Sequence, residues 1–441
     1  MLLVLMLSCF AAVAFGRNLS QIFGVLHCVD DCQRPDPFAN MPYVMRLKIA
    51  EHDLCVIEHL CPVIAPGMHG TPCTNGYAGE YECQNIDLLS FVPVSELGCG
   101  GDTNDIWGWT DPVTGREYAM IGCVDGTSFV DVTDPVNPQV LGFLRTKTDS
   151  SIWRDLKVYK NHVFIVSEAS SHGMQVYDLT QLRDLEPSHL VRELKETTFY
   201  GEFGSAHNIV ANEETGFLYS VGSKTCNSGL HMVDVNDPTN PQFAGCYGQD
   251  GYVHDAQCVI YNGPDGRYKS REVCFCYNED TLTIVDVDDK ANPMMIAREP
   301  YDAYYTHQGW LTEDQTHLLL NDELDELYSP NPHTRSLIWN VEDLEKPYLV
   351  DVFYSEKEAT DHNLYIKGNI AYESNYCAGL RVLDVTNIKE GKIKEIGYFD
   401  VDPNCDEPGF HGAWSSYPYF ESETIIVSSL EHGLFVLKFN A

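Results

Sequence analysis

The sequence predicts an all-β fold: a seven-bladed β-propeller that is closed by an N-terminal strand and preceded by a Cys-rich N-terminal extension. The first of three observations is a recurring tail of two short alternating runs around an Asp/Asn/Pro turn, which is typical of β-hairpins. Its clearest copies are FVDVTDPVNPQVLG (129–142), MVDVNDPTNPQFAG (232–245) and IVDVDDKANPMMIA (284–297). Weaker copies occupy residues 176–184, 338–351 and 382–397.

The second observation is a short element about thirty residues before each tail, with histidine at one aligned place in five of its seven copies. The copies recur at intervals near fifty residues, and each interval has room for four short strands, which is the signature of a propeller. We therefore expect an inner strand to begin at this place in every blade. The seven aligned residues, called the slot residues below, are Asn104, Arg154, His207, His254, His307, His362 and His411.

The third observation is that the last unit lacks its fourth strand after LFVLKFNA (434–441). The run IDLLSFVPVSELG (86–98) precedes the first slot residue and resembles such a strand, so we expect it to close the ring and remove exposed sheet edges. A stacked solenoid is the alternative, but it would need capping units. The predicted organisation is a signal peptide (1–16), a Cys-rich extension (17–84) and a propeller of LVIVD-type repeats (85–441).

The N-terminus and the cysteines predict a secreted glycoprotein. MLLVLMLSCFAAVAFG has the apolar run and small residues of a signal peptide, and no other segment is apolar enough to span a bilayer. Cleavage would leave fifteen of the sixteen cysteines, and their density before residue 100 favours disulfides over a zinc site. The odd number leaves one thiol free or available for an intermolecular disulfide. Asn18 begins a glycosylation sequon.

The formal net charge of −37 restricts the partners. Nucleic acids and anionic membrane surfaces are excluded, because their phosphates would be repelled. An acidic extracellular protein attracts Ca²⁺ and basic partners, although the same charge also serves solubility.

The motifs resemble the choice-of-anchor B family, whose members carry LVIVD-type repeats. The resemblance rests on PCTNGYAGEYECQNIDLLSFVPVSELG, NDIWGWTDPVTGREYA, SSIWRDLKVYKNHVFIVS, HGMQVYDLTQLRD, YTHQGWLTED and NDELDEL, and it runs from about Pro72 to the C-terminus. It implies an extracellular or surface-exposed propeller. It implies no reaction and no catalytic residues, and it says nothing about residues 17–71.

The slot residues form the main candidate site, with three interpretations. Five neutral imidazoles at one end of the channel could share a divalent ion such as Zn²⁺ or Cu²⁺. Arg154 opposes a metal and favours a small anionic ligand instead. In the third interpretation the imidazoles point between blades and bond to backbone carbonyls. A second polar ring follows six of the slots and suggests a hydrogen-bonded scaffold as readily as a ligand site: Asp105, Asp155, Asn208, Asp255, Gln308 and Asn363.

Acidic residues after the second strands are weaker candidates. NDELDEL (321–327) carries Asp322, Glu323, Asp325 and Glu326, which could bind Ca²⁺ but lack EF-hand spacing. We expect them to be solvated loop charges. Four further acids could line the slot end of the channel or solvate loops: Glu168, Glu279, Glu373 and Glu431.

Three functions follow as hypotheses. The first is an extracellular binding or scaffold protein, because no G-x-S-x-G, HExxH or Walker motif assigns a catalytic residue. The second is a metal-dependent hydrolase or lyase with its ion, for example Zn, Cu or Ca, in the histidine ring. The third is an acidic matrix protein that associates with Ca²⁺.

Overall fold

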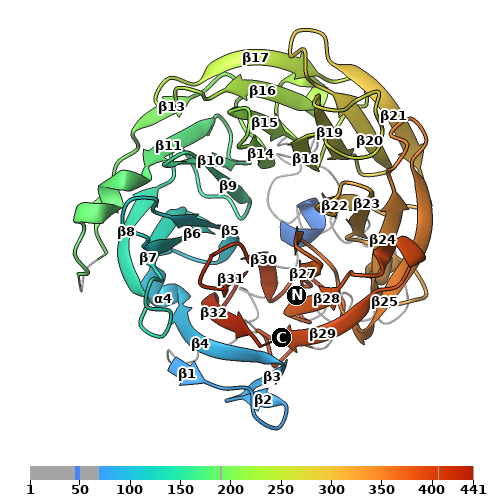
Figure 1. Cartoon of the computed structure of the whole chain (residues 1–441). Helices are drawn as coiled ribbons and strands as arrows, with labels where there is room; N and C mark the ends of the chain where they lie inside the picture. The colour runs from blue at the N-terminus through green and yellow to red at the C-terminus, as the bar shows by residue number, and fades with distance from the viewer. Residues whose placement is uncertain (1–44, 50–68, 189–190, 406, 441) are drawn as a thin grey trace, which may run out of the picture. The chain divides into compact units, whose positions relative to one another are not determined.

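The computed structural model describes residues 45–49, 69–188, 191–405 and 407–440, and places Met1–Ile57 and Glu58–Ala441 in separate units. Residues 45–49 are helical. In the second unit, seven antiparallel sheets are arranged in a ring, which is the predicted seven-bladed propeller (Figure 1). Each blade contributes its first strand to the inside of the ring, and the four strands run outward from there. None of the helices in the described residues combines the length and apolarity that a membrane crossing requires.

The strands of the first four blades follow one pattern, with the inner strand first. Blade 1 contains β5 (Thr103–Thr110), β6 (Glu117–Cys123), β7 (Gly126–Asp131), β8 (Gln139–Arg145) and, parallel to β8, β12 (Glu193–Leu194). Blade 2 contains β9 (Arg154–Tyr159), β10 (His162–Ser167), β11 (Met174–Asp178) and β13 (Thr198–Tyr200). Blade 3 contains β14 (Asn208–Asn212), β15 (Phe217–Val221), β16 (Leu230–Asp234) and β17 (Gln242–Tyr247). Blade 4 contains β18 (Asp255–Ile260), β19 (Glu272–Tyr277), β20 (Thr281–Asp286) and β21 (Met294–Pro300).

The other three blades include the N-terminal strands. Blade 5 contains β22 (Thr306–Leu311), β23 (His317–Asp322), β24 (His333–Asn340) and β25 (Tyr348–Glu358). Blade 6 contains β26 (Leu364–Lys367), β27 (Ile370–Ser374), β28 (Leu380–Asp384), β29 (Lys394–Phe399), β3 (Tyr81–Gln84) and β2 (Tyr77–Ala78). Blade 7 contains β30 (Ala413–Tyr417), β31 (Thr424–Ser429), β32 (Gly433–Phe439), β4 (Ile86–Pro93) and β1 (His69–Thr71). The short helices are α4 (Val94–Leu97), α5 (Asp325–Tyr328), η1 (Leu179–Asp184), η2 (Cys226–Ser228) and η3 (Ile388–Glu390).

The repeated Val-Asp-Val motif builds the turn between the third and fourth strands. In most blades the Asp side chain accepts a hydrogen bond from the backbone N–H two residues later, which is an Asx turn. Asp131 accepts from Thr133 at 2.9 Å, and Asp234 accepts from Asn236 at 2.9 Å. A β-bulge interrupts the pairing just before this Asp in blades 1, 3, 4 and 6, and just before Asn340, which takes its place, in blade 5. The sequence repeat therefore corresponds to a structural repeat, in which a β-bulge is followed by an Asx turn.

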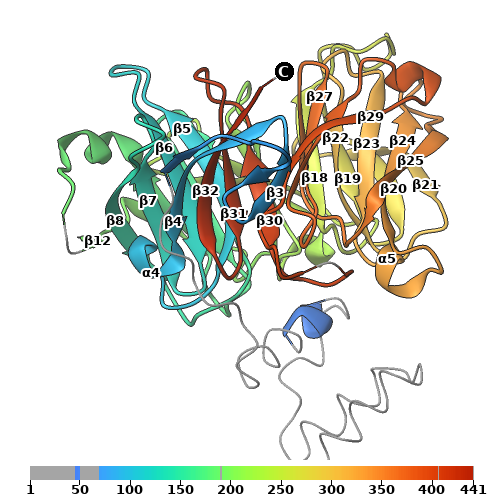
Figure 2. The same ribbon diagram turned by 90° about the horizontal axis from the view of Figure 1, so that it is seen from below.

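The closing strand is confirmed. β4 pairs antiparallel with β32, from Gly433↔Pro93 to Phe439↔Ile86, and the pairing carries a bulge between Val436 and Leu437. This bulge falls at the same place in the blade as those of the Val-Asp-Val motifs, so β4 is the true fourth strand of blade 7. Figure 2 shows β4 beside β32 and the red C-terminal strands. Residues 69–84, assigned above to the extension, add β1 to blade 7 and β2 and β3 to blade 6.

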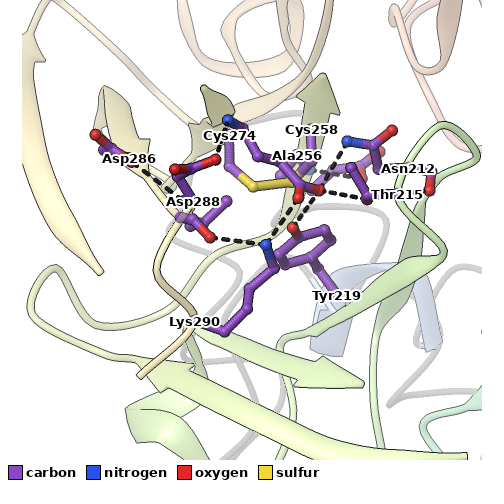
Figure 3. The surroundings of a disulfide bond; sticks show 12 residues. Asn212, Thr215, Tyr219, Ala256, Cys258, Cys274, Asp286, Asp288 and Lys290 are labelled. Atoms are coloured by element: carbon purple, nitrogen blue, oxygen red, sulfur yellow. Dashed lines mark hydrogen bonds and ion pairs between the residues drawn. A yellow bond between two sulfur atoms is a disulfide. The ribbon is translucent and has the colours of Figure 1, made fainter. Parts of the chain in front are cut away.

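Polar groups as well as apolar ones join neighbouring blades. Figure 3 shows a cluster between blades 3 and 4 beside the Cys258–Cys274 disulfide. The buried Glu272 carboxylate accepts hydrogen bonds from Asn212 (2.7 Å), Thr215 (2.9 Å) and Tyr219 (2.6 Å), and pairs with Lys290 at 2.7 Å. The Glu272 carboxylate therefore joins blade 3 to blade 4 through these hydrogen bonds.

Cysteines of the propeller are largely paired. The disulfides are Cys73–Cys83, Cys99–Cys123, Cys226–Cys246, Cys258–Cys274 and Cys377–Cys405. Cys276 is the free thiol among the described residues; it is fully buried, and burial raises its pKa strongly. An intermolecular disulfide through Cys276 would require blade 4 to open. The predicted signal peptide, the Asn18 sequon and Cys28, Cys32, Cys55 and Cys61 lie outside the described residues.

Candidate functional site

The slot residues lie at the start of the inner strands, as the repeat predicted. Every inner strand begins within two residues of its slot residue, and Figure 1 shows these strands surrounding the centre of the ring. The slot therefore marks one end of the central channel, while the later residues of each inner strand line the other end.

Four of the five slot histidines form a continuous arc. The ring centroids of His207 and His254 are 4.3 Å apart, those of His254 and His307 4.2 Å, and those of His307 and His362 4.3 Å. All four side chains are buried. The arc spans blades 3 to 6, because each blade contributes one imidazole.

Two imidazoles of the arc bind the backbone of the next blade. His254 Nδ1 lies 2.9 Å from the carbonyl oxygen of His307, and His362 Nδ1 lies 2.6 Å from that of Trp414. A carbonyl oxygen only accepts, so Nδ1 carries the proton in both rings, and Nε2 of the neutral ring presents a lone pair. The interpretation as a scaffold therefore holds for Nδ1 of these two rings.

Glu323 faces two of these rings. His307 Nε2 lies 3.6 Å from Glu323 Oε2, and His362 Nε2 lies 3.6 Å from Glu323 Oε1. The Tyr376 hydroxyl donates to the same Oε1 at 2.8 Å. One carboxylate from blade 5 thus bridges the imidazoles of blades 5 and 6, and all three side chains are buried. A ligand atom from each lies within 4.8 Å of the others, which is a grouping able to hold a metal ion.

Glu323 was missed as a partner of the histidines, although the sequence contains a signal for it. It directly follows the second strand of blade 5, as Glu168 follows that of blade 2, and Glu168 Oε1 lies 3.2 Å from His207 Nδ1. His411 contacts an acid from the same region of its own blade, with Nδ1 2.9 Å from Glu431 Oε1. Glu168 and Glu431 therefore lie beside slot histidines, whereas Glu373 accepts hydrogen bonds from Ser336 (2.7 Å) and Asn375 (3.3 Å).

The two slot residues that are not histidines bind protein groups. Asn104 Nδ2 donates to the carbonyl of Ile152 at 3.0 Å. Arg154 is buried, donates to the Cys123 carbonyl (3.1 Å) and the Thr146 hydroxyl (2.8 Å), and contacts His172 Nε2 at 3.0 Å. Burial lowers its pKa to about 10. Arg154 therefore holds blades 1 and 2 together, which removes the main support for an anion at the slot ring.

A cavity of about 390 Å³ lies among the later residues of the inner strands. Five aromatic side chains line it: Trp107, Trp310, Tyr365, Tyr417 and Tyr419. Polar and charged lining residues include Lys157, Glu213, Asp255 and Gln257. Burial raises the pKa of Asp255 to about 7, and Lys157 is held by Asp105 at 3.2 Å and Asp155 at 2.6 Å. This second part of the channel has the size and mixed lining of a small-molecule pocket.

The expectation that NDELDEL carries solvated charges is wrong. Asp322 and Glu323 are 0% exposed, Asp325 is 3% exposed and Glu326 is 4% exposed. The segment begins in β23 and continues into α5, which precedes β24. An acidic segment is usually exposed, but these acids are buried because they lie at the contact between blades 5 and 6.

Comparison with known proteins identifies one repeat family within the chain. Residues 216–248, from the second to the fourth strand of blade 3, match the LVIVD repeat. The chain is a β-propeller repeat protein. The propeller is similar to the β-propeller domain of Cps50 (Swd1) from Myceliophteria thermophila, with 12% identity, a TM-score of 0.48, and coverage of 74% of this chain and 94% of that chain. It is also similar to a protein from Lactobacillus plantarum, with 13% identity, a TM-score of 0.47, and coverage of 74% and 88% respectively. No curated protein matches the chain.

Proposed function

We propose that this propeller is an extracellular binding protein whose channel holds a divalent metal ion, such as Zn²⁺, between His307, Glu323 and His362. The observation that carries the proposal is the placement of both imidazole Nε2 atoms 3.6 Å from the two oxygens of one buried carboxylate. Ligands 2.0–2.1 Å from a tetrahedral zinc lie about 3.3 Å from one another. The two nitrogen-to-oxygen distances therefore exceed the ligand spacing of such a site by only a few tenths of an ångström.

The surroundings of His362 support the same proposal. Imidazoles that bind metals usually donate the other ring N–H to a carbonyl or carboxylate, which fixes the ring and its tautomer. The bond from His362 Nδ1 to the Trp414 carbonyl has this form. The Tyr376 hydroxyl orients the carboxylate of Glu323 in the same way. A bound dication would also offset the charge of a carboxylate that is 0% exposed.

The binding role uses the rest of the channel. The aromatic and acidic cavity of about 390 Å³ is large enough for a small organic ligand or for the side chains of a protein partner. Secretion fits the five disulfides of the propeller and the signal peptide that the sequence predicts. N-terminal sequencing of the protein recovered from culture medium tests secretion, and we expect the mature chain to begin near Arg17.

A metal-dependent hydrolase is the second candidate, because two His and one Glu are a ligand set of catalytic zinc sites. Three protein ligands leave a fourth position for water, whose pKa zinc lowers to about 7. Turnover of activated esters by the zinc-loaded protein, abolished in Glu323→Gln, would favour this candidate over a binding role alone.

Metal analysis of the full secreted chain tests the proposal. We expect about one Zn²⁺ per chain to survive dialysis, and Glu323→Gln or His307→Ala to abolish this stoichiometric binding. Glu323→Gln keeps the shape of the side chain and an oxygen for the Tyr376 hydroxyl, so the variant should remain folded. His411→Ala is the matched control, because it removes a slot histidine outside the group of three. Equal zinc binding by the wild type and Glu323→Gln would refute the proposal.

A further inference from the structure

We propose a second cation site, in which Asp325, Glu326 and Asp361 bind one Ca²⁺ ion at the contact between blades 5 and 6. Asp325 and Glu326 belong to α5, which follows β23, and Asp361 lies just before β26. Their carboxylates are 3%, 4% and 1% exposed, and a ligand oxygen from each lies within 4.8 Å of the others.

The negative charge of the buried acids around this site favours a bound cation. Asp322 is also fully buried next to this group, so four acids are gathered within one short region. Arg335 pairs with Asp322 at 3.2 Å and also contacts Asp325. The Arg335 guanidinium therefore forms ion pairs with two of the four buried acids, Asp322 and Asp325. Taking an unpaired carboxylate out of water costs several kcal/mol, which one divalent ion would offset.

The hydrogen bonds of these acids separate structural carboxylates from candidate ligands. Asp322 accepts backbone N–H bonds from Tyr304 at 2.9 Å and Tyr305 at 2.6 Å, so the fold uses it as an acceptor. In the described part of the chain, neither oxygen of the Asp361 carboxylate accepts a hydrogen bond. Buried carboxylates of native proteins are normally satisfied by donors or by ions. The Asp361 carboxylate is therefore the first candidate ligand, and the carboxylates of Asp325 and Glu326 beside it complete the group.

The ligand chemistry indicates calcium instead of zinc. The group contains only carboxylate oxygens, which hard cations prefer, and no imidazole or thiolate. Calcium binds oxygens at about 2.3–2.6 Å in a flexible geometry, which suits carboxylates that come from two different blades. Magnesium would need a tighter octahedron, with ligands at about 2.0–2.1 Å.

Protons are the competing explanation for the same cluster. Burial raises the pKa of Asp325 to about 7, and burial and the Asp361 charge raise that of Glu326. In that case neutral carboxyls would share protons and the cluster would need no ion. The two explanations predict different effects of Asp361→Asn and Glu326→Gln on calcium binding and on thermal stability.

The test uses the full secreted chain, stripped with a chelator, and titrates CaCl₂ by calorimetry at physiological salt. We expect one Ca²⁺ per chain in the wild type and binding at least about tenfold weaker in Asp361→Asn and Glu326→Gln, because each loses one ligand charge. Glu356→Gln, which removes an exposed carboxylate from β25 of the same blade, should bind like the wild type and controls for diffuse counterions. Binding should persist in His307→Ala, which separates this site from the proposed zinc site.

Thermal unfolding gives a second readout. Without calcium, Asp361→Asn and Glu326→Gln should be at least as stable as the wild type, because each removes a charge from a crowded cluster. With calcium, only the wild type and Glu356→Gln should gain stability. Absence of stoichiometric calcium in the wild type, or equal calcium binding by the wild type and both amide variants, would overturn the proposal. So would loss of stability of both amide variants in calcium-free buffer.

Discussion

The ion pair of Glu272 and Lys290 predicts an asymmetry between two substitutions that remove the same interaction. Lys290→Met leaves Glu272 with three donors, from Asn212, Thr215 and Tyr219. Glu272→Gln instead leaves an ammonium, whose side chain is 11% exposed, without a counter-ion. A buried charge without its partner costs about 3–5 kcal/mol.

The magnitudes follow from what each residue retains. Lys290 keeps a hydrogen bond to the Val287 carbonyl at 2.8 Å and lies 4.2 Å from the Phe217 ring, so we expect Glu272→Gln to cost about 3 kcal/mol, at the low end of that range. We expect Lys290→Met to cost about 1 kcal/mol, the usual value of one hydrogen bond. The double variant should be more stable than Glu272→Gln alone, because it removes the isolated charge.

Urea unfolding with the disulfides intact measures these differences through the midpoint and slope. Lys392→Met is the matched control, since its pair with Glu390 (2.6 Å) is exposed and should contribute less than about 1 kcal/mol. The reasoning would be refuted if Lys290→Met cost as much as Glu272→Gln. It would also be refuted if the double variant were no more stable than Glu272→Gln.

Three further predictions concern pH, closure and the free thiol. Burial, and the charge of Arg154, lower the pKa of His172 to about 4 in the folded protein. Between about pH 6.5 and 4 the imidazole is therefore protonated in the unfolded chain but neutral in the folded one. Stability should therefore fall by up to about 3 kcal/mol as the pH drops from 6.5 to 4, and His172→Gln should remove this part of the slope in pH-dependent unfolding. Phe91→Ala should destabilise the ring by about 3–5 kcal/mol, because Phe91 is buried 4.6 Å from the Phe435 ring in the closing pair; unfolding without loss of stability would contradict the closure argument. Cys276 should not react with a thiol reagent in the native protein but should react fully in urea, and rapid native labelling would show that blade 4 opens.

The fold could be predicted from the sequence because the repeat is local. Each Asp of a Val-Asp-Val motif makes its turn with a residue two positions away, so the pattern is visible without tertiary contacts. The closing strand could be predicted from the sequence in two steps. The last unit lacks a fourth strand, and the alternating run at residues 86–98 belongs to no other unit. The choice-of-anchor B resemblance adds the expectation of an extracellular propeller, and the LVIVD match in blade 3 supports the repeat.

The site was harder to predict because it depends on how blades meet. The slot alignment identified the four adjacent imidazoles, but it treated His411 and Arg154 as equivalent members of one ring. Arg154 turns to protein acceptors, and His411 contacts Glu431. The position of Glu323 after a second strand was a usable signal, because Glu168 occupies the same place in blade 2. The burial of its neighbours Asp325 and Glu326 arises at the boundary of blades 5 and 6, which no local pattern encodes.

The closing pair also sets the order in which the protein can fold during synthesis. β4 is the first long strand of the ring to be made, and its partner β32 follows about 340 residues later. At about 5–20 residues per second, the ribosome needs on the order of 20–70 s to supply that partner. During this interval both faces and one edge of the growing arc are without their final neighbours, and exposed strand edges promote aggregation. Chaperones that cover the β4 edge while the last blade emerges are therefore expected to decide the yield of this protein in cells.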